Sequence, residues 1–329
     1  MRATLKQARL AEGVGRHDPL GLLVGCSGGR DSIALLGLLA LVAEVDHLRL
    51  AVGHVDHGLR PEAAAEAAQV RSVAAGLGLP LSEVRLDLDP AAPGVPARAR
   101  AARHAALEQM RGAAGAHRLA LAHTATDQAE TVLLHLCRGA GLRGLGGMQA
   151  VEPDTPIVRP LLELPRAATG PLCARLELPF VDDPTNDDPG HPRIRIRRDV
   201  LPALGVGRGG VEEALAASAR AAREAEAALR IWIDREREIR TVGVCRYDLS
   251  GWRGLPRAIR VGVVQAIAVH AGLATDAIGR RTLEAIDRGL LAGGAKRWAL
   301  AGAAALCTDG DTLSITLPGP VRTPPADAT

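Results

Sequence analysis

Aromatic side chains are nearly absent from this chain of 329 residues: three tryptophans, one tyrosine and one phenylalanine make up 2% of it. Since 47% of the residues are hydrophobic, a sizeable core has to be packed from small aliphatic side chains. The five cysteines are scattered and form no C-x-x-C pair, which argues against a metal site built from local pairs and favours reduced thiols.

Long apolar runs are missing as well. The longest, Ile33 to Ala43, is too short to span a bilayer, and Met1 to Pro19 contain no apolar stretch typical of a secretory signal. We therefore expect a cytoplasmic protein without membrane insertion. The net charge of +3 permits an anionic partner without demonstrating one, and the length suits two domains.

A glycine-rich stretch near the N-terminus organises the rest of the chain. Leu22 to Val24 predict a short buried strand, Ser27-Gly28-Gly29 a turn without side-chain bulk, and Ser32 to Val45 a helix. Adjacent glycines let backbone N–H groups converge, and the start of the helix adds partial positive charge. The turn can therefore bind a phosphate, although Gly-Gly before a helix is also an ordinary tight turn.

Strand and helix patterns alternate over the first 205 residues. This alternation predicts a doubly wound, mostly parallel sheet of an α/β fold with helices on both faces. Further strands are expected at Leu48–Val55, Leu81–Leu88, Arg118–His123 and Thr155–Leu161, and further helices after Pro61, at Ala97–Ala114 and at Asp127–Arg138. In such sheets ligands bind beyond the carboxyl ends of the strands, where Ser27–Ser32, His54–Arg60 and His123–Asp127 all fall.

The composition changes after residue 205. We expect a catalytic domain at 1–205, a hinge and linker helix at 206–240, a smaller α+β domain at 241–317 and a disordered tail at 318–329. In the smaller domain the predicted elements are a strand at Thr241–Leu249, helices at Leu255–Leu273 and Ile278–Leu291, and a hairpin at Trp298–Leu317 that turns at Asp309-Gly310.

The residue types of the first loop indicate which class of phosphate-binding loop it belongs to. It lacks the Gly-Lys-Ser/Thr ending of a Walker loop and the third glycine of a dinucleotide fold. Instead Ser27-Gly28-Gly29-Arg30-Asp31-Ser32 resembles the SGGxDS loop of the PP-loop ATP pyrophosphatases. The resemblance implies that ATP is split between its α and β phosphates, with Ser27 to Ser32 and His54 as ATP-binding residues and Asp31 holding Mg²⁺.

A second set of motifs resembles one family within that superfamily, the tRNA(Ile)-lysidine synthetases. The segments that match, in order, are HTATDQAET (123–131), RGAGLRGL followed by Met148, RPLL (159–162), DPTN (183–186) and RIRIR (193–197). Arg100 to His104 are similar to the family's AR..RY segment. The chain departs from the pattern where Thr124 replaces a histidine, Thr126 an aspartate, His104 a tyrosine and Ile194 an asparagine, which leaves Asp127 as the expected second carboxylate.

The resemblance implies a two-step reaction, in which ATP adenylates the wobble cytidine of an isoleucine tRNA with a CAU anticodon and free L-lysine then displaces AMP. Asp31 and Asp127 are the expected catalytic and Mg²⁺-binding residues, and Asp127 with Glu130 is expected to bind the lysine. As structural alternatives, Asp127 could cap its helix and Glu130 could be a capping partner or lie on a solvated face.

Arginines supply the cationic surface that tRNA needs. The expected tRNA-binding residues are Arg138, Arg143, Arg193, Arg195 and Arg197. If residues 193–197 are extended, alternation places the three odd-numbered arginines on one face, although most charge runs are simply solvated. The oligomeric state is open, and a homodimer is one alternative.

Three other functions compete with this interpretation. A tRNA thiolase would share the adenylation step, but it needs cysteine pairs or cluster ligands. An enzyme of glutamine-dependent amidation needs an amidotransferase domain, and none accompanies the loop. A nucleotide-binding or tRNA-binding module without turnover is the third alternative, suggested by Thr126.

Overall fold

The computed structural model describes residues 1–56, 63–87, 95–181, 192–205, 210–274 and 278–317. The chain divides into two compact units, Met1–Arg223 and Glu224–Thr329, and the division falls inside one long helix, α10 (Val211–Arg240). The predicted boundaries at residues 205 and 240 stay predictions. Most of the predicted hinge, His57–Arg60, Asp183–Asn186 and the tail at 318–329 lie outside the described residues.

The first unit is built on a five-stranded parallel sheet in the order β3-β2-β1-β4-β5, which confirms the predicted doubly wound α/β fold. Its strands are β1 (Leu20–Gly25), β2 (Leu48–Asp56), β3 (Leu81–Arg85), β4 (Arg118–Ala120) and β5 (Ile157–Val158). Its helices before α10 are α1 (Arg2–Ala11), α2 (Arg30–Val42), α3 (Ala63–Gly76), α4 (Val95–Ala113), α5 (Ala125–Cys137), α6 (Leu142–Leu145), η1 (Arg166–Ala168), α7 (Thr169–Arg175), α8 (Pro192–Arg195), the π-helical η3 (Ile196–Val200) and α9 (Leu201–Leu204).

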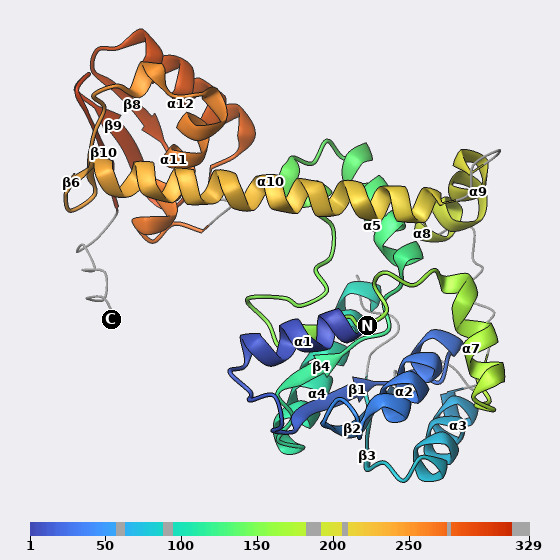
Figure 1. Ribbon diagram of the computed structural model, residues 1–329. Helices are drawn as coiled ribbons and strands as arrows, with labels where there is room; N and C mark the ends of the chain where they lie inside the picture. Colours follow the sequence, from blue (N-terminus) through green and yellow to red (C-terminus); the bar gives the residue numbers. More distant parts are fainter. Residues whose placement is uncertain (57–62, 88–94, 182–191, 206–209, 275–277, 318–329) are drawn as a thin grey trace. The chain divides into compact units, whose positions relative to one another are not determined.

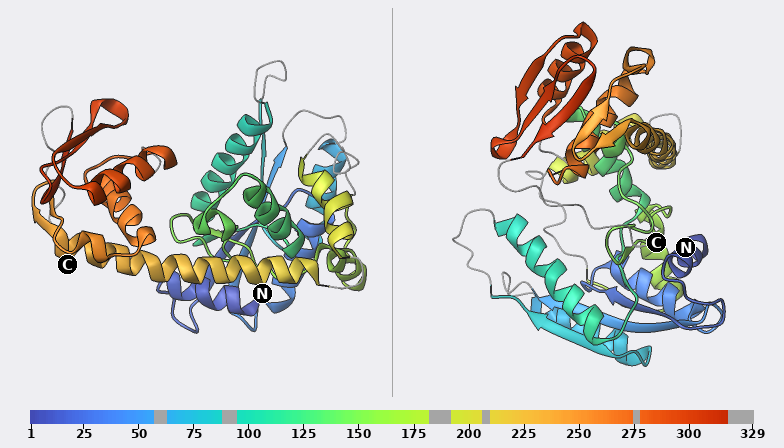
Figure 2. Two further views of the ribbon diagram at one scale, coloured as in Figure 1. Left: turned by 90° about the horizontal axis from the view of Figure 1, so that it is seen from above. Right: turned by 90° about the vertical axis from the view of Figure 1, so that its left-hand side faces the viewer.

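Helices cover both faces of this sheet (Figures 1 and 2). On one face Leu22 and Val24 of β1 pack with α1, α2, α3 and α7 in a single apolar cluster. On the other face Leu23 packs with Leu107 and Met110 of α4. This burial on both sides explains why β1 is apolar at nearly every position instead of alternating.

The order of the strands fixes where a ligand can bind. From β1 the chain crosses to β2 on one side, whereas β4 pairs with β1 on the other side. A crevice therefore opens at the carboxyl ends of β1 and β4, where the winding direction reverses. The glycine loop follows β1, and His123 and α5 follow β4.

The second unit contains an antiparallel sheet in the order β6-β7-β10-β9-β8 packed on helices α11 and α12. Its elements are β6 (Thr241–Gly243), β7 (Arg246–Asp248), η4 (Trp252–Gly254), α11 (Arg257–His270), α12 (Arg280–Ala292), β8 (Lys296–Ala299), η5 (Ala301–Ala303), β9 (Ala305–Thr308) and β10 (Thr312–Thr316). This confirms the smaller α+β part and the pairing of β9 with β10 around Asp309-Gly310.

Two predicted elements of this unit are wrong in detail. The single strand expected at Thr241–Leu249 is two short antiparallel strands, because the chain reverses at Cys245, whose φ is +55°. The segment expected to be one hairpin contributes three strands, since β8 pairs with β9 ahead of the β9–β10 hairpin.

Candidate active site

The loop between β1 and α2 is a closed turn. Gly28 has a φ of +87°, and an added Cβ would lie 3.3 Å from the carbonyl oxygen of Glu66, so the position suits glycine. The Ser32 hydroxyl donates to the carbonyl oxygen of Gly29 (2.8 Å) and accepts from the backbone N–H of Ser27 (3.2 Å). These bonds hold the loop against the first turn of α2, where backbone N–H groups favour an anion.

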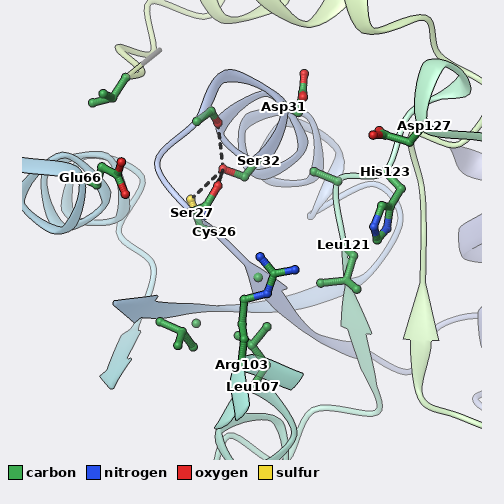
Figure 3. Close-up of a pocket in the computed structure, with 16 residues that line it drawn as sticks. Cys26, Ser27, Asp31, Ser32, Glu66, Arg103, Leu107, Leu121, His123 and Asp127 are labelled. Carbon is green, nitrogen blue, oxygen red and sulfur yellow. Dashed lines mark hydrogen bonds between the residues drawn. The ribbon is translucent and has the colours of Figure 1, made fainter. Parts of the chain in front are cut away.

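A cavity of about 340 Å³ opens beside this loop at the carboxyl ends of β1, β2 and β4 (Figure 3). Five predicted site residues line it, namely Ser27, Gly29, Asp31, Ser32 and Asp127. The volume and the polar lining suit a small polar ligand. Segments separated by about a hundred residues in the sequence thus meet at one site, as the clusters at the strand ends predicted.

Asp31 lies in the first turn of α2 and is held on both carboxylate oxygens. Thr169 Oγ1 donates to Oδ1 at 2.6 Å, and Nε of Arg166 lies 3.1 Å from Oδ2. Burial raises the pKa of this carboxyl, the Thr169 hydrogen bond lowers it, and the charge of Asp127 raises it further. Asp31 and Asp127 both line this cavity, so the two carboxyl groups share one space.

Asp127 lies in the first turn of α5. Thr124 is the N-cap, and its backbone N–H and hydroxyl both donate to Asp127 Oδ2 at 2.8 Å. Asp127 is therefore the third residue of a capping box. It is not the N-cap of the helix, which was the structural alternative in the sequence analysis. Its other oxygen, Oδ1, lies 3.6 Å from Nη2 of Arg197, and the residue lines the cavity.

Glu130 lies behind the cavity wall. It is fully buried, its Oε1 accepts from Nε of Arg197 at 2.6 Å, and its Oε2 has no hydrogen-bond partner among the described residues. Burial raises the pKa of this carboxyl, and the Arg197 hydrogen bond lowers it. Since Glu130 does not line the cavity, its predicted contact with lysine would require Arg197 to move.

Comparisons with known proteins bear on the family of this chain. A family model described as a PP-loop domain matches residues 3–204. The tRNA(Ile)-lysidine synthase of Thermobifida fusca is 38% identical over 277 residues, which cover 83% of this chain and 85% of that protein. The chain belongs to the tRNA(Ile)-lysidine synthase family. A second relative, the tRNA(Ile)-lysidine synthase of Leifsonia xyli, is 46% identical over 66% of each chain.

Among solved structures, the U34-tRNA thiolase NcsA of Methanococcus maripaludis with its [4Fe-4S] cluster aligns with a TM-score of 0.54 and 18% identity. The alignment covers 66% of this chain and 76% of the thiolase, and it shows a shared fold alone. Among the residues that the structure describes, no three His, Cys, Asp or Glu side chains are grouped to hold a metal. The same part of the chain contains no helix long and apolar enough to cross a membrane.

Thr126, one of the four positions at which the sequence departs from the motif pattern, has defined contacts. Thr126 is buried, and its hydroxyl donates to Oε1 of Glu212 on α10 at 2.8 Å while accepting the backbone N–H of Arg166 at 3.1 Å. A carboxylate is therefore present beside Thr126, although it comes from another helix.

Arg103 and His123 are among the cavity residues that were not predicted as site residues. Arg103 extends from α4 into the cavity, and His123 lies beside Asp127 (Figure 3). Burial lowers the pKa of His123 to about 4, with Asp127 opposing the shift and Arg159 adding to it, so the ring is neutral at pH 7. Its Nδ1 accepts from Nε of Arg159 at 3.2 Å. Both residues lie in segments that resemble lysidine synthase motifs, and this resemblance could have identified them as site residues.

Three predicted ATP-binding residues do not line the cavity. Gly28 and Arg30 belong to the loop, and His54 lies near the end of β2, but none of the three is in the cavity lining. His54 is buried, and its Nδ1 is 2.8 Å from the carbonyl oxygen of Cys26, so it supports the loop from below. A direct contact of these residues with ATP stays a prediction.

The arginine run has a different conformation from the one expected. Residues 193–197 lie in α8 and η3 and are helical, so the extended alternation is wrong. Arg193 and Arg197 share the helix face that meets α5, where Arg193 Nη2 donates to Thr131 Oγ1 at 3.3 Å. Arg195, Arg138 and Arg143 are exposed, and these three remain available to contact a nucleic acid.

Proposed function

We propose that the protein is an ATP-dependent tRNA-modifying ligase that joins free L-lysine to C2 of the wobble cytidine of an isoleucine tRNA with a CAU anticodon. The observation that carries the proposal is the placement of Asp31 and Asp127 on one cavity with the glycine loop, in a chain of the lysidine synthase family. The cytidine oxygen would attack the α-phosphorus of ATP, and pyrophosphate would leave.

The loop residues provide binding for the leaving pyrophosphate. Backbone N–H groups at the start of α2 and the Ser27 hydroxyl are donors of the kind that stabilise developing negative charge. Arg103 adds a guanidinium on the opposite wall, and burial lowers the pKa of that group, which favours a bound anion as its partner.

Asp31 and Asp127 fit a magnesium ion, because both are carboxylates, both line the cavity, and the charge of one raises the pKa of the other. When bound, such an ion would neutralise charge on the departing pyrophosphate. In the absence of a cation, the arginines Arg166 and Arg197 compensate part of this negative charge.

The second step needs a neutral amine. With a reference pKa near 10.4, only about one lysine side chain in two thousand is neutral at pH 7. Asp127 lines the cavity, where its carboxylate can orient the ammonium group and accept its proton before the nitrogen attacks C2 and AMP leaves. Neutral His123 beside it avoids a competing positive charge.

The test is incorporation of radiolabelled lysine into tRNA transcripts. The expected result is incorporation that requires ATP and the CAU anticodon, with one AMP and one pyrophosphate released per lysine. Sulfur incorporation instead of lysine would favour a thiolase, and ATP binding without pyrophosphate release would favour a module without turnover. The exposed Arg138, Arg143 and Arg195 and the second unit are proposed to bind the tRNA.

A further inference from the structure

The segment 164–169, between β5 and the first turn of α7, holds the carboxylate of Asp31 from outside the cavity. Thr169 donates its hydroxyl to Asp31 Oδ1 at 2.6 Å, and Nε of Arg166 lies 3.1 Å from Oδ2. Thr169 is fully buried, and neither residue is in the cavity lining. The direction of both carboxylate oxygens therefore depends on where this segment is fixed.

The contact of Arg166 Nε with Asp31 is an ion pair without hydrogen-bond geometry. Among the residues that the structure describes, this buried nitrogen has no hydrogen-bond partner. Because a charge–charge contact of this kind has little directional preference, its length follows the position of the Arg166 backbone. What holds that backbone decides how firmly Asp31 is placed.

Two hydrogen bonds tie the backbone of this segment to the start of α5. The N–H of Ala125 donates to the carbonyl oxygen of Leu164 at 2.9 Å, and the N–H of Arg166 donates to Thr126 Oγ1 at 3.1 Å. Because Thr126 is buried, a hydrogen bond lost there is not readily replaced by one to water.

Glu212, in the first turn of α10, fixes the orientation of the Thr126 hydroxyl. A threonine hydroxyl has one hydrogen, and Thr126 donates it to Oε1 of Glu212 at 2.8 Å. The lone pairs of the oxygen are thereby left for the N–H of Arg166. Without this acceptor the hydroxyl could turn its hydrogen toward that N–H, and the bond to Arg166 would be lost.

A further contact of α10 beside this segment is weaker. Nη1 of Arg220 lies 3.2 Å from Oε1 of Glu163, but the two side chains are 54% and 74% exposed, so the pair contributes little. The hydrogen bond between Thr126 and Glu212 is thus a buried link from α10 to the segment that holds Asp31.

We propose that Glu212 is a positioning residue for Asp31, and that it acts through Thr126 and the backbone of Arg166. Glu212 does not line the cavity beside the glycine loop, so it acts without touching the nucleotide. The inference rests on the proposed function, because it concerns the carboxylate assigned there to the cation. It also gives a role to Thr126, which stands where the family pattern has an aspartate.

The test measures the binding of Mn²⁺, which favours the same carboxylate ligands as Mg²⁺ and gives an EPR signal when free. The full-length protein is titrated with Mn²⁺ in the presence of α,β-methylene-ATP, an analogue that is not split between its α and β phosphates. Neither tRNA nor lysine is added. Binding of the same analogue in EDTA is measured separately, because it reports the glycine loop without a cation.

Two variants break the chain of hydrogen bonds and two preserve it. Glu212→Ala removes the acceptor, and Thr126→Val removes the hydroxyl while keeping the shape of the side chain. Glu212→Gln keeps an acceptor oxygen, and Thr126→Ser keeps the hydroxyl. The matched control is Glu213→Ala, because Glu213 has the same charge in the same helical turn but is exposed, whereas the Thr126 hydrogen goes to Glu212.

We expect Glu212→Ala and Thr126→Val each to weaken Mn²⁺ binding by about 3- to 10-fold, the range of one hydrogen bond. The double variant should bind no more weakly than the weaker single variant, since both changes break the same chain of contacts. Glu212→Gln, Thr126→Ser and Glu213→Ala should stay within about twofold of the wild type. Binding of the analogue in EDTA should be unchanged in every variant.

Four results would overturn the positioning role. They are wild-type Mn²⁺ affinity in Glu212→Ala, an equal loss in Glu213→Ala, fully additive losses in the double variant, and a loss in Glu212→Gln as large as in Glu212→Ala. A loss of analogue binding in EDTA that matches the loss of Mn²⁺ binding would also contradict it, because the substitution would then disturb the site as a whole.

The two proposals fail in different ways. If the wild type binds Mn²⁺ with the analogue but incorporates no lysine into tRNA, the proposed function is wrong, and the Mn²⁺ titrations still decide the positioning role. If lysine is incorporated and all variants bind Mn²⁺ as the wild type does, only the positioning role is wrong. If the wild type binds no Mn²⁺ with the analogue, both are wrong.

Discussion

Replacing Glu130 by glutamine should leave the protein nearly as stable as the wild type, whereas alanine at the same position should destabilise it strongly. Glu130 is fully buried, and within the part of the chain that the structure describes only one of its two oxygens has a hydrogen-bond partner. Glutamine keeps an oxygen that accepts from Arg197 and removes a charge whose burial is costly. Alanine removes the acceptor and leaves Arg197 with Asp127 alone, at 3.6 Å.

The expected magnitudes follow from these contacts. For Glu130→Gln, the hydrogen bond from Arg197, worth about 1.5–3 kcal/mol between charged groups, weakens because glutamine is neutral. This loss is offset by the desolvation no longer required, so the free energy of unfolding should change by no more than about 1 kcal/mol. For Glu130→Ala we expect a loss of about 3 kcal/mol, at the low end for a broken buried pair, because Arg197 is 26% exposed.

Urea titrations at two pH values provide the measurement. Burial raises the pKa of Glu130 from 4.5, so the native state binds more protons than the unfolded state between 4.5 and the raised value. The wild type should therefore lose stability relative to Glu130→Gln as the pH rises through this window. If Glu130→Gln is destabilised as much as Glu130→Ala, the charge is what stabilises the site and the reasoning is refuted.

Three further predictions concern the first cavity. Asp31→Asn should lower pyrophosphate release by about 100-fold or more, whereas Asp46→Asn, which removes a surface ion pair, should leave it unchanged. His123→Asn should make the stability of the protein less dependent on pH. The pKa of His123 is about 4 in the native state and 6.5 in the unfolded state, so the neutral ring contributes about 3 kcal/mol to the free energy of unfolding above pH 6.5. This contribution is lost as the pH falls toward 4. Gly28→Ala should cost about 1–2 kcal/mol and raise the KM for ATP, because φ is +87° there.

Each of these predictions has a clear opposing result. Pyrophosphate release that survives in Asp31→Asn would exclude the carboxylate from the first step. An unchanged slope of stability against pH in His123→Asn would place the titrating group elsewhere. For Gly28→Ala the matched control is Gly76→Ala, where an added Cβ meets nothing within 4 Å, and equal effects of both substitutions would contradict the argument from φ.

The part of the fold nearest the loop was predictable from the sequence. β1 is buried on both faces and therefore apolar throughout, and the two glycines mark the turn before α2. Three clusters at strand ends were expected to meet because carboxyl ends of parallel strands share one edge. The structure confirms this for Asp31 and Asp127, which line one cavity.

The arginine run shows where local pattern fails. R-I-R-I-R alternates and predicts a strand, but tertiary contacts decide in favour of a helix. Helical spacing brings Arg193 and Arg197 to Thr131 and Glu130 of α5, and it buries Ile196 against Ala129 and Leu201. Those partners lie more than sixty residues away along the chain, outside any local window.

The surroundings of Glu130 and the location of Glu212 could not be predicted, for a related reason. Spacing alone placed Glu130 on the same helix face as Asp127, but it could not show that Arg197 covers the carboxylate. Glu212 lies in a segment with the composition of a solvated helix, and only the hydrogen bond from Thr126 reveals its place beside the site. Hydrogen bonds between polar side chains that are far apart along the chain produce no periodic pattern in the sequence.

Helix α10 runs without interruption from Val211 to Arg240, past the point where the two units divide. Each helical residue turns the chain by about 100° and advances it by 1.5 Å. Inserting or deleting one residue between Arg223 and Leu229 would therefore rotate the second unit's attachment by more than a quarter turn, whereas an insertion of seven residues would nearly restore its phase.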